Sequence, residues 1–219
     1  MYAFLDELSQ SLSDDAIVCA DAGSAFLVTP QALLLNSERQ RYITSGGQAE
    51  MGFTVPACVG AAVASGKTVI GITGDGSFML NMQELATIAY NKLPVKLFIW
   101  NNNGYMGIRQ MQNNNFSARL LGVDEDSGLD FPDFQRLAES FDIKHTKITT
   151  LSQLRNELQV MWSYQGPILY EVTCQADEVL VGAGTRKLSN GENVQILEDM
   201  TPYLPRKLFD SLMLVSQVQ

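Results

Sequence analysis

The sequence alternates short, β-rich apolar runs with longer segments whose apolar residues recur at helical spacing. The apolar runs predict six strands, at residues 16–21, 41–44, 68–73, 95–100, 143–148 and 167–172. The segments between them predict helices at 24–36, 53–65, 78–92, 131–141 and 151–164. Strands that alternate with helices at this spacing form βαβ units. We therefore expect an α/β fold: a doubly wound, mostly parallel six-stranded sheet with helices on both faces.

Length and charge limit the classes of protein that this fold can serve. With 219 residues, 46% of them hydrophobic, the chain can bury one sizeable core. Its 15 basic and 24 acidic residues give a net charge of −9, which disfavours nucleic acid as a partner. The longest apolar stretch, 53–65, is shorter than the roughly 20 residues that cross a bilayer, so no membrane is expected. Because acids stand where a signal peptide carries basic residues, we expect a cytoplasmic protein.

Cysteine and histidine offer little for catalysis by protein side chains alone. Cys19, Cys58 and Cys174 are far apart and outside any CxxC spacing, so we expect core residues instead of disulfides or a zinc site. The single histidine, His145, lies in an alternating run and is expected to be a structural strand residue. Ser-His-Asp and Cys-His catalysis therefore lack a base. Chemistry in this chain needs a cofactor or another chain.

The composition of the sequence changes after Cys174: turn-forming residues become frequent, and no long stretch has helical or strand periodicity. We therefore predict a main domain over 1–175 and an extended C-terminal arm of the same domain over 176–219. The arm either packs on the domain's own surface or covers an active site or a subunit interface.

Three strand-to-loop junctions carry unusual residues: 21–24 after the first strand, 74–77 after the third and 101–104 after the fourth. Ligands of open parallel sheets bind beyond the carboxyl ends of the strands. Glycine and amide residues there expose backbone N–H groups that can receive phosphate oxygens. Two familiar phosphate motifs do not fit, because Met79 replaces the third glycine of a Rossmann fingerprint and Ala61 the first glycine of a P-loop.

Asp75 and Asn102 are the candidate metal ligands. The Gly-Asp-Gly turn and Asn101 are separated by 24 residues, 77–100. A helix and strand of that length return the second loop beside the first, so the carboxylate and the amide oxygen can converge on one cation. Mg²⁺ prefers such hard oxygen ligands and is usually held together with substrate phosphates. The alternative is a pair of turns that serve only backbone geometry.

The run ITGDGSFMLNMQELATIAYNKLPVKLFIWNN resembles the signature of thiamine diphosphate-dependent enzymes. The stretch SGGQAEMGFTVPACVGAA resembles the preceding cofactor segment of the acetolactate synthase-like branch, and ADAGSAF resembles its first diphosphate loop. The resemblance covers residues 1–175, and LEDMTPYLPRKLF is similar to the tail of some bacterial relatives. It implies the thiamine diphosphate-binding fold, with thiamine diphosphate and Mg²⁺ as cofactors.

The resemblance also implies roles for individual residues. Asp75 and Asn102 would bind Mg²⁺ by side chain and Gly104 by its carbonyl. The carbonyl of Ala49 would accept a hydrogen bond from the aminopyrimidine. Met51 matches the bulky apolar residue under the cofactor that enforces its V-shaped conformation, unless it is an ordinary core methionine. The diphosphate would be met by backbone N–H groups of the first loop and of the turn that begins at Gly74, namely those of Ala22, Gly23, Ser24, Gly76 and Ser77.

The function implied is that of a diphosphate- and Mg²⁺-binding domain in an enzyme that decarboxylates or carboligates 2-oxo acids, a lyase or transferase. In the family the activating glutamate comes from a pyrimidine-binding domain, so we assign no catalytic residue to these loops. We expect that partner domain in a longer chain or a separate subunit, and a homo-oligomer. Arg109 would meet a substrate carboxylate or serve as a solvated or structural cation.

Two other functions stay open at this point. One is a non-catalytic cofactor-binding or dimerisation module that needs a partner domain. The other is a nucleotide-dependent dehydrogenase, which the missing third glycine disfavours.

Overall fold

The computed structural model describes residues 1–187, 191 and 193–213. It divides the chain into two compact units, Met1–Glu178 and Val179–Gln219. Most of the predicted arm, 176–219, belongs to the second unit, and its residues 188–190, 192 and 214–219 lie outside the described residues. The division of the chain into a main domain and an arm of that domain stays a prediction.

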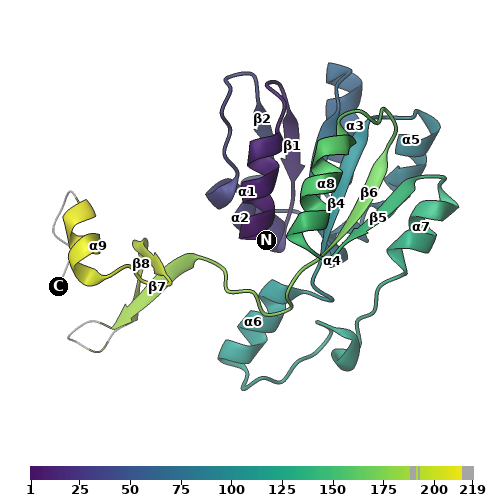
Figure 1. Ribbon diagram of the computed structural model, residues 1–219. Helices are drawn as coiled ribbons and strands as arrows, with labels where there is room; N and C mark the ends of the chain where they lie inside the picture. The colour runs from purple at the N-terminus through teal and green to yellow at the C-terminus, as the bar shows by residue number, and fades with distance from the viewer. Residues whose placement is uncertain (188–190, 192, 214–219) are drawn as a thin grey trace. The chain divides into compact units, whose positions relative to one another are not determined.

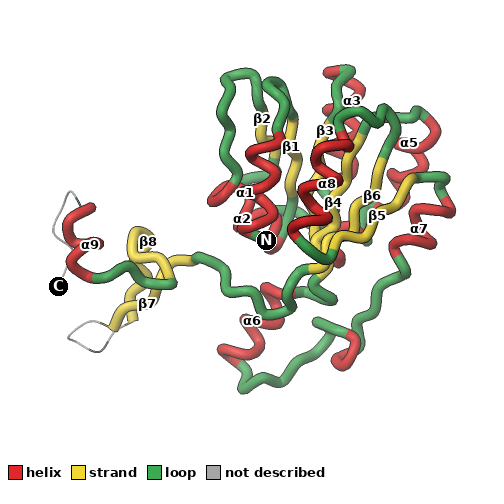
Figure 2. Tube along the Cα trace, in the orientation of Figure 1, coloured by secondary structure: helices red, strands yellow, loops and turns green. Residues whose placement is uncertain are grey.

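The first unit is built around a six-stranded sheet in which every pair of neighbouring strands runs parallel. Its strands are β1 (Ile17–Ala20), β2 (Arg41–Ile43), β3 (Val69–Gly74), β4 (Val95–Asn101), β5 (Lys144–Ile148) and β6 (Ile168–Thr173). Their order across the sheet is β2-β1-β3-β4-β6-β5 (Figure 2). The prediction of a mostly parallel six-stranded sheet is confirmed.

Helices cover both faces of this sheet (Figure 1). They are α1 (Tyr2–Ser11), α2 (Gly23–Ala32), α3 (Thr54–Ser65), α4 (Asp75–Phe78), α5 (Leu85–Tyr90), α6 (Met106–Asn115), α7 (Phe134–Ser140) and α8 (Leu151–Met161), with 3₁₀ turns η1 (Met82–Glu84) and η2 (Glu125–Ser127). Helices α1 and α8 pack against each other on one face, and the buried residues of α3, α5 and α7 share a cluster on the other.

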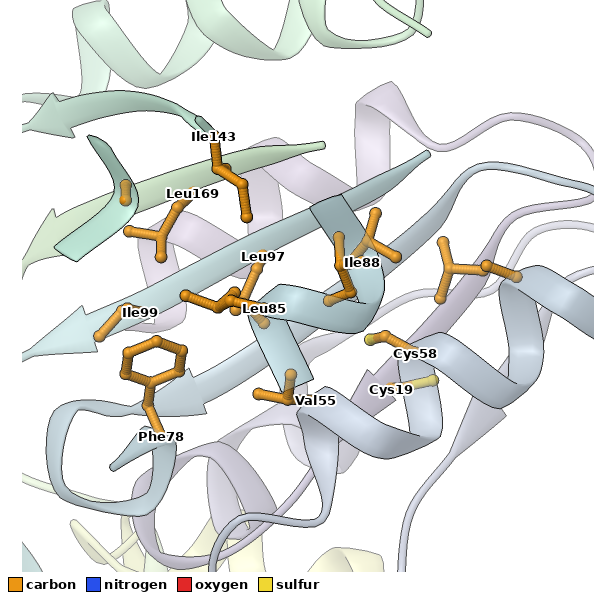
Figure 3. Packing of buried hydrophobic residues seen from close by; sticks show 14 of the residues in the cluster. Cys19, Val55, Cys58, Phe78, Leu85, Ile88, Leu97, Ile99, Ile143 and Leu169 are labelled. Carbon is orange, nitrogen blue, oxygen red and sulfur yellow. The ribbon is translucent and has the colours of Figure 1, made fainter. Parts of the chain in front are cut away.

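The core fills both faces of the central strands. On the α3 side, Val55 and Cys58 pack with Phe78 and Leu97 (Figure 3). On the α1 side, the ring of Phe4 lies 5.1 Å from Phe98 and 5.5 Å from Trp100, both in edge-on contact. Burial of the central strands on both faces explains why their sequences are continuously apolar.

Four predicted helices are shorter than expected by more than one residue, and of these α7 and α8 differ from their predictions, 131–141 and 151–164, by only a few terminal residues. The helix predicted over 24–36 ends at Ala32, two residues after Pro30, whose ring removes a backbone donor. The helix predicted over 78–92 is divided among α4, η1 and α5, because the Asn81 side chain donates to the carbonyl of Gly52 at 2.9 Å where a regular helix would continue. The same hydrogen bond ties Gly52, the residue after Met51, to the segment that follows α4.

The second unit contains an antiparallel pair, β7 (Gly182–Lys187) and β8 (Asn193–Thr201), and the helix α9 (Arg206–Leu212). Within it, the Arg206 guanidinium donates to both oxygens of Asp199, at 2.7 and 2.9 Å. None of these elements is predicted from the sequence. In the described part of the chain, no helix has the length and apolar character that crossing a membrane would require.

Strand order places the loops of interest together. The chain leaves β1 toward β2 on one side, whereas it leaves β3 toward β4 on the other. The carboxyl ends of β1 and β3 therefore flank the point where the winding reverses, which is where open α/β sheets bind ligands.

Candidate functional site

A cavity of about 270 Å³ opens beyond the carboxyl ends of β1, β3 and β4. It is lined by all of the predicted binding residues except Ala49, namely Ala22, Gly23, Ser24, Met51, Gly74, Asp75, Gly76, Ser77, Asn102 and Gly104. These residues come from four separate segments of the sequence. The parallel sheet brings them together because each follows a strand or precedes a helix at the same edge.

The lining also includes residues that the sequence analysis missed, at the start of α6: Tyr105, Met106, Gly107 and Ile108. The ring of Tyr105 lies over Gly76, where a Cβ atom would stand 2.1 Å from Tyr105 Cε1. Gly76 is therefore required for space and not for a special φ. Only a weak helical signal marks this segment, because 106–115 ends in three consecutive asparagines.

Asp75 is buried at the floor of the cavity, where it is 2% exposed. Its Oδ1 accepts the N–H of Gly76 at 2.7 Å, and its Oδ2 accepts those of Asn102 at 3.0 Å and Gly104 at 3.1 Å. Burial raises the pKa of Asp75, while the backbone donors oppose that rise by stabilising the anion. One carboxylate oxygen, Oδ2, is thus bonded to the backbone of both residues that are predicted to supply the second and third ligands, Asn102 and Gly104.

Asn102 carries an atom that lacks a partner. Its Oδ1 is buried and accepts no hydrogen bond from any residue that the structure describes. Gly104, two residues on, has φ 147°, and a Cβ there would stand 2.0 Å from the Val123 carbonyl oxygen. A glycine is thus required at the position whose carbonyl is the predicted third ligand. The donor set of one carboxylate, one unsatisfied amide oxygen and one carbonyl suits a hard cation.

Within the described ranges, no three His, Cys, Asp or Glu side chains gather in a way that could hold a metal ion. A cation at this site would therefore depend on the mixed set above, completed by ligand oxygens.

The predicted diphosphate donors differ in availability. Gly23 and Ser24 lie in the first turn of α2, where helical N–H groups have no intrahelical acceptor. In contrast, the N–H of Ala22 donates to Asp21 Oδ1 at 2.8 Å and that of Gly76 to Asp75 Oδ1. The structure thus commits two of the five predicted donors to carboxylates, which the sequence pattern could not show.

Met51 is 36% exposed and lines the cavity, so it is not an ordinary core methionine. The following N–H, that of Gly52, donates to Ser77 Oγ at 2.8 Å and fastens this segment to the turn after β3. Ala49 lies two residues earlier with φ 53°, a conformation that is uncommon outside glycine.

Arg109 on α6 is 6% exposed and serves the backbone. Its guanidinium donates to the carbonyls of Asn102 at 3.3 Å and Ala176 at 3.0 Å, and lies 3.4 Å from Asp124. Of the two predicted roles, this geometry favours the structural cation. The contact with the Asn102 carbonyl makes Arg109 part of the support of the metal-ligand loop.

Fold and cavity together define an α/β domain that binds a phosphorylated cofactor at the switch point of a parallel sheet. Residues 21–172 match the family model of the thiamine pyrophosphate enzyme, C-terminal TPP binding domain. The chain belongs to this family, and the predicted family, fold and cofactor are confirmed.

Known relatives are acetolactate synthases. The chain is 37% identical over 171 residues to the acetolactate synthase large subunit of Pyropia yezoensis, a match that covers 78% of this chain and 28% of that protein. It is also 37% identical over 170 residues to the isozyme 2 large subunit of Escherichia coli (strain K12), covering 77% and 30%. Acetolactate synthase 2, chloroplastic, of Zea mays is 35% identical over 173 residues, covering 77% and 26%. The chain thus spans less than a third of the length of these relatives.

Proposed function

We propose that this chain supplies the diphosphate- and Mg²⁺-binding half of a thiamine diphosphate site in an enzyme that decarboxylates or carboligates 2-oxo acids. The observation that carries the proposal is the buried Asn102 Oδ1, which accepts no hydrogen bond within the described part of the chain and lines the same cavity as Asp75. A buried acceptor without a donor costs about 1–3 kcal/mol. Coordination of a cation would remove that cost.

In this proposal Asp75 and Asn102 hold Mg²⁺ by their side-chain oxygens and Gly104 by its carbonyl. The N–H groups of Gly23, Ser24 and Ser77 receive the diphosphate, and those of Ala22 and Gly76 join them only by exchanging a carboxylate for a phosphate oxygen. Gly74 contributes to the wall of the cavity.

Met51 would support the cofactor from below, and the Ala49 carbonyl would accept a hydrogen bond from the aminopyrimidine. When bound, the cofactor supplies a nucleophilic carbon and an electron sink for 2-oxo acids. The protein's contribution at this end is to fix the position of the cofactor and its charge.

The remaining parts of the enzyme are proposed from the resemblance. A pyrimidine-binding domain, in a longer chain or another subunit, would bring the activating glutamate, and the enzyme would be a homo-oligomer. A cytoplasmic location is supported by the free cysteines Cys19, Cys58 and Cys174, which fit a reducing compartment.

Calorimetric titration of thiamine diphosphate into the full chain, with Mg²⁺ and with EDTA, tests the site. We expect binding with Mg²⁺, its loss in EDTA, and much weaker binding of unphosphorylated thiamine. Binding that is indifferent to EDTA would contradict the metal site, and equal binding of thiamine would contradict the diphosphate site.

The alternative is a non-catalytic module that binds cofactor or dimerises and needs a partner domain. Turnover of pyruvate after addition of a separately produced, glutamate-bearing pyrimidine domain would support the enzyme, whereas cofactor binding without turnover in that mixture would support the module.

A further inference from the structure

Asp21 is a fully buried carboxylate, 0% exposed, that directly follows β1. The roles proposed above leave it without a task. Its Oδ1 accepts the N–H of Ala22 at 2.8 Å, and its Oδ2 accepts the N–H of Thr54 at 3.3 Å. The hydroxyl of Thr73 reaches both oxygens, at 3.2 and 3.0 Å.

Each of these donors belongs to a segment that carries part of the candidate cofactor site. Ala22 precedes the first turn of α2, Thr54 follows the segment of Met51, and Thr73 precedes the turn of Asp75. The three segments are far apart in sequence and meet at one side chain. A single carboxylate therefore holds all three at the same edge of the sheet.

Ser77 is a fourth residue that interacts with Asp21. The hydroxyl of Ser77 lowers the pKa of Asp21, and its oxygen accepts the N–H of Gly52 at 2.8 Å. Ser77 thus connects the Asp21 carboxylate to the residue that follows Met51.

The chemistry of these partners requires an acceptor at every position. A carboxylate presents two oxygens with about four acceptor sites, whereas an asparagine presents one oxygen and two donor hydrogens. Asp21 forms no ion pair with any cation among the described residues. Burial raises its pKa, and the hydrogen bonds of Ser77, Thr54, Thr73 and Ala22 counteract that rise. Burial of a carboxylate without a cation partner lowers the stability of the fold unless hydrogen bonds compensate for the lost hydration.

We propose that Asp21 is a positioning residue, which fastens the loop before α2, the segment of Met51 and the turn of Asp75 in the arrangement that thiamine diphosphate requires. The inference rests on the proposed function for its ligand. It does not place Asp21 in contact with the cofactor.

Four variants of the full chain test this role. Asp21→Asn keeps the side-chain volume but replaces one acceptor oxygen with a donor group. Thr73→Val removes only the hydroxyl that reaches Asp21, and Thr73→Ser restores it. Lys96→Met is the control for lost stability, since Lys96 is buried near the opposite end of β4 and donates to the carbonyls of Tyr164 and Gly166, each at 2.6 Å.

Two measurements are made on each variant: amide hydrogen exchange of the ligand-free chain, and titration of thiamine diphosphate in Mg²⁺. We expect Asp21→Asn and Thr73→Val to speed exchange at the amides of Ala22, Gly52 and Thr54. We expect the same two variants to weaken cofactor binding about tenfold or more, the size of one lost hydrogen bond to a charged group. Thr73→Ser and Lys96→Met should bind as the wild type does.

Unchanged exchange in both variants would overturn the inference, and so would wild-type affinity in both. It would equally be overturned if Lys96→Met weakened binding as much as Asp21→Asn, because general loss of stability would then explain the effect. If Asp21→Asn does not fold, the milder Thr73→Val decides. A wild-type chain that fails to bind the cofactor would contradict the proposed function, while the exchange data would still decide whether Asp21 fastens the three segments.

Discussion

The carboxylate of Asp75 accepts the backbone N–H of Asn102 at 3.0 Å, which ties the turn after β3 to the loop after β4. The bond lies between residues that the sequence separates by a complete helix and strand. Because it involves the backbone of Asn102, the Asn102 side chain remains available to a ligand. The hydrogen bond that joins the two loops is made within the protein and uses neither of the predicted ligand atoms of Asn102 and Gly104.

Replacement of Asp75 with alanine should abolish Mg²⁺-dependent cofactor affinity. The change removes the only carboxylate that lines the cavity within the described residues, so thiamine diphosphate affinity should fall by at least about 100-fold. Calorimetric titration in Mg²⁺ measures it, and Asp126→Ala, which removes an exposed acid, is the control. Unaltered affinity of the Asp75 variant would remove Asp75 from the metal site.

Asn102→Ala should weaken cofactor binding without lowering the stability of the metal-free chain. Without metal, the wild-type Oδ1 is a buried acceptor that no described residue satisfies, so its removal should leave the metal-free chain as stable as before or slightly more stable. With Mg²⁺ and thiamine diphosphate, the same variant should lose most of the stabilisation that the ligands confer. Thermal unfolding with and without ligands gives both values. A clear destabilisation of the metal-free variant would show that Oδ1 has a structural partner.

Met51→Ala should affect turnover far more than stability. Met51 is 36% exposed, so its truncation should cost less than about 1 kcal/mol, whereas a misplaced cofactor can lower the rate about 100-fold. Met161→Ala is the matched comparison. Because Met161 is fully buried, its truncation should lower the free energy of unfolding by about 2–5 kcal/mol. Denaturant unfolding of the chain and kcat of the assembled enzyme are compared. Equal losses of stability in the two variants would refute the role of Met51.

Acid should destabilise the fold through Glu171. His145, whose Nε2 lies 3.5 Å from Oε2, together with Lys147 and Asn101, lowers the pKa of Glu171 from 4.5 to about 2. The unfolded chain therefore takes up the proton first, so this contribution is complete above the ordinary pKa and is lost as the pH falls through about 2. Urea unfolding at about pH 5 and about pH 3 should show a smaller loss in Glu171→Gln and in Lys147→Met than in the wild type. If the wild type and both variants lost the same stability between these pH values, groups other than Glu171 would cause the acid sensitivity.

The chain alone should release no CO₂ from pyruvate in the presence of thiamine diphosphate and Mg²⁺. Proton transfer at the pyrimidine end needs a carboxyl group within hydrogen-bond reach, and Asp75 is committed to the diphosphate end. A CO₂ assay of the purified chain against a reaction without protein measures this. Turnover that Glu50→Gln abolishes would show that the chain contains its own activating acid.

Local sequence determined the fold well where the chain is apolar on both faces. The four central strands β1, β3, β4 and β6 were predictable because buried parallel strands are continuous apolar runs, as in the run that contains Phe98 and Trp100, whereas the edge strands β2 and β5 are more polar. Helix α6 was not predictable from its asparagine-rich context, and the break at Asn81 arises from a side-chain bond to Gly52, 29 residues away. Tertiary contacts of this kind are invisible to periodicity.

Most residues of the candidate site were predictable from the sequence, but the hydrogen bonds among them were not. Glycine and oxygen-bearing residues at the strand ends identified the cavity lining. The capture of the Ala22 and Gly76 N–H groups by carboxylates was not foreseeable, nor was the convergence of three segments on Asp21. These features depend on the register of β1 and β3, which only the assembled sheet defines.

Because the ring of Tyr105 packs over Gly76, substitutions at these two positions depend on each other. A methyl group at position 76 would collide with the ring, so alanine there requires either that the Tyr105 ring turns away or that a smaller residue stands at 105. The reverse order is open, because a smaller residue at 105 merely leaves a void. Exchange of the two residues is thus directional: alanine at 76 is accommodated more easily once residue 105 is smaller.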